Sequence, residues 1–159
     1  MNKPTIVQLN KRYIIGVEYK TNLNNEKYFE EIPKFYFDFG SNEYYLRIPE
    51  KIAPNMSYGI ACDFHDDGNF SFIIGEEVQD SVTELDDGFV NFEIPEGKYA
   101  EFKINGSVDL VQNSRRYIYG TWLLNSNYER REGPDFEITD VLQSTYPNQM
   151  KITIYIPIL

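Results

Sequence analysis

The sequence is poor in the residues that build cross-linked or metal-bound scaffolds. It holds a single cysteine, Cys62, and a single histidine, His65, among 159 residues. One cysteine cannot close an internal disulfide, so no oxidising compartment is required. One cysteine and one histidine also offer no zinc-binding spacing, and a Ser-His-Asp triad would have to recruit His65 from a predicted turn. We therefore predict no metal site and no cofactor, with Cys62 as core filling rather than a nucleophile.

Long apolar runs and clustered basic residues are missing as well. No run approaches the ~20 residues of a membrane span, and residues 1–13 lack the continuous apolar core of a signal peptide. We expect a cytoplasmic protein that does not enter a membrane. The 15 Lys and Arg stand against 25 Asp and Glu, for a net charge of −10, which argues against direct nucleic-acid binding. The acidic surface is typical of a protein kept in solution, with docking of a basic partner as the alternative.

Aromatic residues are abundant by contrast. They make up 16% of the chain, with 13 Tyr and 11 Phe, inside a hydrophobic fraction of 42%. Residues 1–159 are thus long and apolar enough to form one globular domain. A tyrosine buries its ring while its hydroxyl seeks a hydrogen bond, so this composition fits either strand-rich structure or an aromatic recognition surface.

Alternating patterns predict most of the secondary structure. They indicate strands near residues 13–19, 58–64, 70–74, 90–94, 100–104, 136–138 and 151–158, with Asp67-Gly68 as a hairpin turn. Helical spacing replaces alternation between Phe29 and Phe39, and again up to Trp122 in a segment that Ser107 or Asp109 can cap.

The order of these elements repeats. Residues 5–78 and 97–159 each read as strand, helix and hairpin, so we predict an internal repeat. Each unit would lay one helix on a three-stranded antiparallel sheet. The predicted fold class is α+β, with two pseudo-symmetric strand-helix-strand-strand units, helices on one face of the sheet or sheets, and a ligand groove on the other.

The predicted groove depends on which strand residues face away from the helices. We assign Ile152, Ile154, Ile156 and Ile158 to the helix side, together with Phe136 and Ile138. That leaves Glu137, Tyr155 and Tyr99 on the open face, opposite small residues of the first unit such as Gly16, Gly59 and Ala61. A one-residue change of register would invert the assignment. A carboxylate among aromatic rings attracts cations, and a solvated strand glutamate is the alternative for Glu137.

Four segments resemble a known family in register: Glu96–Phe102, Ile118–Leu123, Gly133–Ile138 and Ile154–Ile158. The first half fits as well, at Ile14–Glu18, Ile32–Phe35 and Tyr58–Ile60. The family is that of AraC-type effector-binding, or GyrI-like small-molecule-binding, domains, and the resemblance covers essentially the whole chain.

This resemblance implies recognition of hydrophobic, often cationic compounds with Glu137 as the acidic anchor. The ligand-side aromatic positions would be Tyr99, Tyr155, Trp122, Tyr117, Tyr58 and Phe35. The family often has Trp where this chain has Phe35, and an aromatic residue where it has Thr139.

Many members of the family are the sensing half of a transcription regulator. No DNA-binding half is recognised in this sequence, so direct regulation would need a partner regulator protein. Alternatives are sequestration of toxic compounds, gyrase inhibition, and hydrolysis of electrophilic compounds with Glu137 as general base. Binding and hydrolysis would use the same residues, and binding is favoured because it requires fewer assumptions. The ligand and the oligomeric state are not determined by the sequence.

Overall fold

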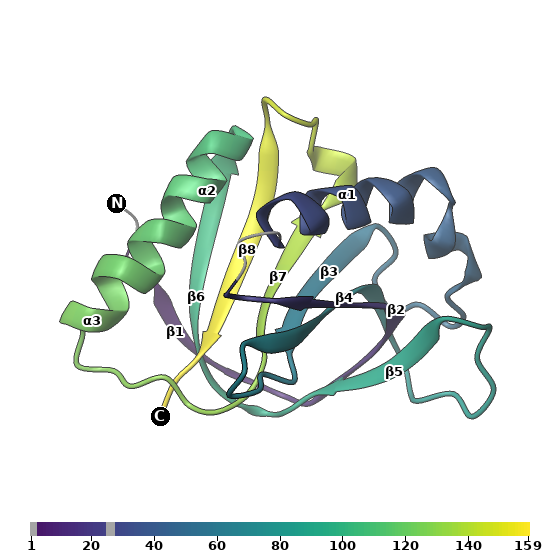
Figure 1. The fold of residues 1–159 in the computed structure, drawn as a ribbon, viewed down its shortest axis with the longest axis horizontal. Coiled ribbons are helices and arrows are strands. Elements are labelled where there is room, and N and C mark those ends of the chain that lie inside the picture. The colour runs from purple at the N-terminus through teal and green to yellow at the C-terminus, as the bar shows by residue number, and fades with distance from the viewer. Residues whose placement is uncertain (1–2, 25–27) are drawn as a thin grey trace.

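One antiparallel sheet runs through the molecule (Figure 1). The computed structural model describes residues 3–24 and 28–159. The strands are β1 (Thr5–Leu9), β2 (Arg12–Asn22), β3 (Met56–Cys62), β4 (Asn69–Val78), β5 (Phe89–Ile94), β6 (Gly97–Gly106), β7 (Asp135–Asp140) and β8 (Met150–Pro157). Their spatial order is β1-β6-β8-β7-β3-β4-β2-β5.

The helices are α1 (Tyr28–Ser41), α2 (Val108–Tyr117) and the short α3 (Leu123–Asn125). A π-helical turn, Ile118–Trp122, joins α2 to α3, and two 3-10 turns cover Tyr44–Arg47 and Val141–Gln143. Ser107 caps α2, since its Oγ accepts a hydrogen bond from the backbone N–H of Leu110. The predicted helices and strands are therefore present, whereas β1 was not predicted.

The predicted repeat is visible in the sheet. The first unit, β2-α1-β3-β4, and the second, β6-α2-β7-β8, pair their strands in the same order. Within the units, Gly59 lies opposite Ile74 and Glu137 lies opposite Ile154. The units join where β3 pairs with β7, and there Gly59 lies opposite Glu137. The fold class is thus confirmed, and these two residues hold equivalent positions beside a pseudo-two-fold axis.

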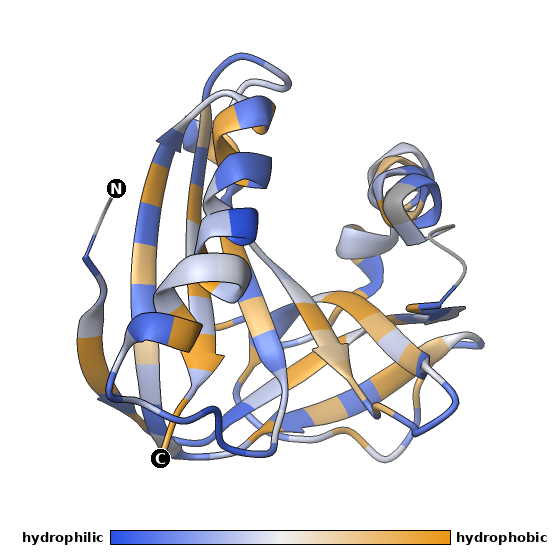
Figure 2. Ribbon diagram, turned by 60° about the vertical axis from the view of Figure 1, so that its left-hand side comes forward, coloured by the Kyte–Doolittle hydropathy of each residue, from blue (hydrophilic) through white to orange (hydrophobic). Residues whose placement is uncertain are grey.

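Both long helices lie on one face of the sheet. α1 packs on β2 and β4, and α2 packs on β6 and β8. Phe35 and Phe39 of α1 belong to the hydrophobic cluster between α1 and the sheet. Val111 of α2 and the adjoining Ile118 belong to the cluster between α2 and the sheet. The side chain of Phe29, also predicted for the buried face of α1, lies outside the described residues. Figure 2 shows the two helices standing apart over a strongly curved sheet.

The opposite face of the sheet is closed, which corrects the predicted groove. Edge strand β1 is followed directly by β2, which lies near the other end of the sheet. Edge strand β5 is likewise followed by β6, which lies beside β1. These two connections bring the ends of the sheet together. One hydrophobic cluster consequently draws residues from all eight strands. Tyr99, Tyr58 and Tyr155 lie inside it, with exposures of 0%, 2% and 7%.

The predicted face of β7 was also wrong. Glu137 pairs directly with Ile154, and directly opposed residues of antiparallel strands point to the same face. Glu137 therefore points toward the helices, and Phe136 points into the closed core with Tyr155. The physical reason is that both faces of this sheet are buried, so apolar residues on β7 do not identify the helix side. Within the described part of the chain, no helix is long and apolar enough to cross a membrane.

Candidate functional site

Glu137 lies on β7, a central strand of the sheet, and receives one side chain from each long helix. Arg115 of α2 donates from Nη2 to both carboxylate oxygens, at 2.6 and 2.7 Å, and from Nε at 3.2 Å. Tyr36 of α1 donates its hydroxyl to Oε1 at 3.2 Å. The Glu137 side chain is only 13% exposed. Since β7 is paired on both sides, the sheet holds this carboxylate firmly in place.

Gly59 provides the space for this arrangement. A Cβ at Gly59 would lie 1.9 Å from the Tyr36 hydroxyl and 2.9 Å from the Phe72 ring. Tyr36 itself stands edge-on to Phe72, with ring centroids 5.8 Å apart. The absence of a side chain in the first unit thus lets Tyr36 reach the acid of the second unit.

The protonation states of Arg115 and Tyr36 follow from their surroundings. Burial lowers the pKa of Arg115 while the Glu137 carboxylate raises it, and the net direction is upward. Burial also raises the pKa of the Tyr36 phenol well above its ordinary value, and Glu137 adds to the rise. Arg115 is therefore a full cation and Tyr36 a neutral donor at physiological pH.

A second acid and arginine lie on the same face of β7. Arg130 donates to Oδ1 of Asp135 from Nη2 at 2.7 Å and from Nε at 3.1 Å. The Tyr119 hydroxyl donates to Oδ2 at 2.6 Å. Tyr119 belongs to the π-helical turn after α2, and such turns are frequent at functional sites. Glu137 and Asp135 thus each accept hydrogen bonds from one arginine and one tyrosine.

The three tyrosines predicted to surround the ligand on the strands do not meet Glu137. Tyr99 donates its hydroxyl to the Pro95 carbonyl at 2.8 Å, and Tyr155 donates to Glu101 at 2.8 Å. Tyr58 accepts a hydrogen bond from Arg12 at 2.9 Å. All three pack in the closed core, on the face of the sheet that is turned away from the helices.

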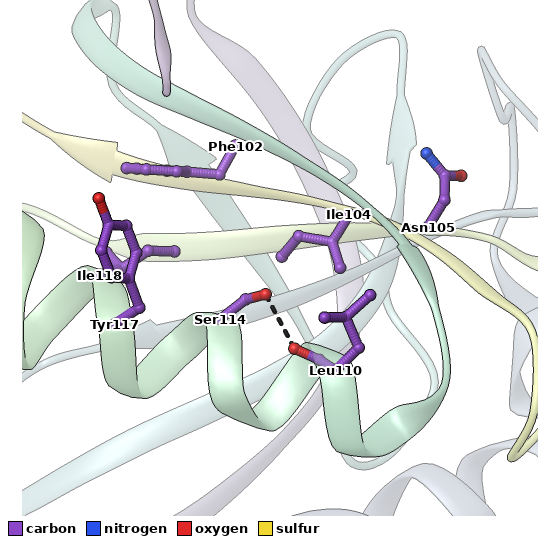
Figure 3. A pocket seen from close by; sticks show the side chains of 7 residues that line it. All are labelled: Phe102, Ile104, Asn105, Leu110, Ser114, Tyr117 and Ile118. Atoms are coloured by element: carbon purple, nitrogen blue, oxygen red, sulfur yellow. Dashed lines mark hydrogen bonds between the residues drawn. The ribbon is translucent and has the colours of Figure 1, made fainter. Parts of the chain in front are cut away.

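The other predicted aromatics are dispersed as well. Phe35 packs on Tyr19 under α1, with ring centroids 5.4 Å apart. Trp122 stands edge-on to Phe102 at 5.0 Å and stacks with Tyr128. Tyr117 lines a pocket of about 320 Å³ between α2 and β6, where Ser114 donates to the Leu110 carbonyl (Figure 3). Only Glu137, of the predicted set, occupies the centre of the site.

The sequence analysis did not identify five residues of the site: Tyr36, Arg115, Tyr119, Arg130 and Asp135. The first helix carried a usable signal, because Tyr36 belongs to its predicted apolar spacing and directly follows Phe35. Asp135 carried another, since it alternates with Glu137 on one strand. Arg115 carried none, because an arginine on an amphipathic helix is ordinarily a surface residue.

The arrangement suits recognition of charge better than proton transfer. A general base needs a free lone pair toward its substrate, and the Glu137 oxygens already accept from Arg115 and Tyr36. Within residues 3–24 and 28–159, no group of three or more His, Cys, Asp or Glu side chains is placed to hold a metal ion.

Two solved structures share the fold of this chain. SAV2435, bound to tetraphenylphosphonium, superimposes with a TM-score of 0.78 over 99% of this chain and 94% of that one, at 13% identity. The integron cassette protein VCH_CASS2 of Vibrio cholerae does so with a TM-score of 0.70 over 99% and 96%, at 19% identity. At 13% and 19% identity, these likenesses establish the fold of the chain.

The family follows from the sequence itself. The model of the Cass2 family, integron-associated effector binding proteins, matches residues 5–158, so the chain belongs to that family. The transcriptional regulator BrlR of Pseudomonas aeruginosa is 33% identical over 112 residues, which cover 70% of this chain and 41% of the regulator. The effector-binding resemblance predicted from the sequence is therefore confirmed.

Proposed function

We propose that this chain binds small hydrophobic cations with Glu137 as the charged anchor. One observation carries the proposal: a carboxylate only 13% exposed is already matched with a cation, the Arg115 guanidinium. A buried carboxylate without a cationic partner is costly, so this position is built to hold positive charge. The Tyr36 hydroxyl on Glu137, and the Phe72 ring packed against Tyr36, supply a mixed polar and aromatic setting.

The comparisons support the chemistry of this ligand. SAV2435 shares the fold and holds tetraphenylphosphonium, a cation whose charge lies inside an apolar shell. Such a cation gains both from a carboxylate and from aromatic faces, the latter by roughly 0.5–2 kcal/mol per ring. We propose ligands of the same class here.

We further propose a sensing role in the cytoplasm. The similarity to BrlR supports it, although the chain spans only 41% of that regulator's length. The net charge of −10 does not favour direct contact with DNA. Ligand occupancy would then be reported through a partner regulator protein.

The test is a calorimetric titration of tetraphenylphosphonium into wild type, Glu137→Gln and Glu93→Gln. Both substitutions remove one negative charge, but Glu93 lies on β5 with 54% of its side chain exposed. We expect saturable binding that weakens about tenfold or more in Glu137→Gln and stays within about twofold in Glu93→Gln. Equal affinity in the two variants would refute Glu137 as the anchor.

A further inference from the structure

We propose that Arg115 is an internal ligand of the Glu137 anchor, and that an incoming cation binds by displacing it. The inference rests on the proposed function and adds the step by which the site opens. It also identifies Arg115 as the residue that sets affinity for cations, because the arginine and the ligand compete for one carboxylate.

Of the two partners, Arg115 is the one that can move. Glu137 sits on a central strand paired on both sides, with 13% of its side chain exposed. Arg115 lies in the last turn of α2 with 31% of its side chain exposed. A long, flexible side chain at that exposure has solvent into which its charged end can turn.

The neighbouring pair, Arg130 with Asp135, shows what a fixed arginine looks like in the same setting. Arg130 also donates to the Gly133 carbonyl at 2.8 Å and to the Arg131 carbonyl at 3.3 Å. Its guanidinium further lies 5.7 Å from the centroid of the Phe64 ring. Among the described residues, the hydrogen bonds of the Arg115 guanidinium all go to Glu137. Arg130 is thus anchored independently of its acid, whereas Arg115 depends on Glu137 alone.

Displacement makes the site selective for charge. A neutral apolar molecule offers Glu137 no replacement for the guanidinium, so the pair stays closed against it. A cation supplies the missing charge and leaves no buried carboxylate unpaired. Glu137 links the two long helices, because it contacts both Arg115 of α2 and Tyr36 of α1. The exchange would break the contact with α2, so ligand binding would change this link between the helices.

The experiment compares tetraphenylphosphonium affinity in wild type, Arg115→Met and Arg116→Met. Each variant removes one positive charge from α2 and keeps an apolar stem, but Arg116 is exposed and donates to Asn113. We expect Arg115→Met to bind about tenfold tighter or more, equivalent to about 1.4 kcal/mol. Arg116→Met should stay within about twofold of wild type.

Two further measurements separate displacement from a merely structural role. Triphenylphosphine oxide, a neutral molecule of related shape, should gain no affinity in Arg115→Met, whereas a site that had only become wider would bind it better. Adding Arg115→Met to Glu137→Gln should no longer tighten cation binding, because the competition acts through that carboxylate. Arg115→Lys keeps a cation without the two-pronged contact and should fall between wild type and Arg115→Met, which preserves the test if the Met variant folds poorly.

The outcomes distinguish this inference from the proposed function. Wild type and Arg115→Met binding tetraphenylphosphonium equally well, or Arg115→Met binding it more weakly, would overturn displacement while leaving the anchor in place. No binding by wild type, Arg115→Met or Arg115→Lys would overturn the proposed function, and the displacement step with it.

Discussion

Gly59 and Glu137 face each other across the β3–β7 pairing, at equivalent positions of the two structural units. One unit contributes a charge at this position and the other contributes only space. The space is used by Tyr36, whose hydroxyl reaches Glu137 at 3.2 Å. A symmetric framework thereby holds an asymmetric site, since a second side chain opposite Glu137 would collide with the tyrosine.

We expect Gly59→Ala to destabilise the fold and to displace Tyr36 from Glu137. The new Cβ would lie 1.9 Å from the Tyr36 hydroxyl and 2.9 Å from the Phe72 ring, so both must shift. Overpacking of this kind costs about 1–3 kcal/mol, which a urea unfolding titration will measure. Gly40→Ala is the matched control: a Cβ at Gly40, in α1, meets nothing within 4 Å, and alanine favours a helix over glycine by up to about 1 kcal/mol. Equal losses in the two variants would show that Gly59 is not needed for the contact between the units.

The sequence predicted the order of the elements better than it predicted which residues meet. Alternation and the Asp67-Gly68 turn identified the main strands, because those signals are local. The faces of β7 were misassigned because Phe136 and Glu137 both point into buried surroundings, one into the closed core and one toward the helices. Burial on both sides removes the contrast between apolar and polar positions that a face assignment needs.

The central acid could be predicted, whereas its partner could not. Glu137 stood in a segment resembling a family pattern, but its contact with Arg115 joins residues 22 positions apart on different elements. The curvature that closes the far face likewise depends on β1 and β5 pairing at opposite ends of the sheet. Such long-range pairings leave no periodic trace in the sequence.

Tyr58 should make stability depend on alkaline pH. Burial raises the pKa of its phenol from 10.0 to about 12, with Arg12 lowering it and Glu77 raising it by smaller amounts. Because the folded-state pKa is the higher one, the stabilisation is complete below pH 10 and is lost as pH rises through about 12. We expect the free energy of unfolding to fall across this window, by up to about 1.4 kcal/mol per pH unit for this group.

The comparison that isolates Tyr58 is Tyr58→Phe, with unfolding measured by urea from pH 9 to 12. The variant lacks the titrating hydroxyl, so its stability should decline less steeply than that of wild type. Absorbance near 295 nm should also show one fewer phenol ionising near pH 12 in the folded variant. Parallel stability curves for the two proteins would contradict the assigned shift.

Cys62 should be inert to thiol reagents in the folded protein. The residue is 6% exposed, and burial raises the pKa of the thiol to about 12. At pH 8 this leaves about one thiol in ten thousand as the reactive thiolate. We expect no reaction with Ellman's reagent over minutes in buffer and one equivalent released in guanidinium chloride. Rapid reaction without denaturant would show that the core around β3 opens easily.

Tyr155 tests directly which face of the sheet binds the ligand. Its hydroxyl donates to Glu101 at 2.8 Å inside the closed core, on the side of the sheet away from Glu137. Tyr155→Phe should cost about 1–3 kcal/mol of stability, because a buried hydrogen bond to a carboxylate is lost. Its affinity for tetraphenylphosphonium, measured well below the unfolding temperature, should stay within about twofold of wild type, in contrast to Glu137→Gln. A strong loss of affinity in Tyr155→Phe at unchanged stability would instead place the ligand on the far face and return Tyr155 to the binding site.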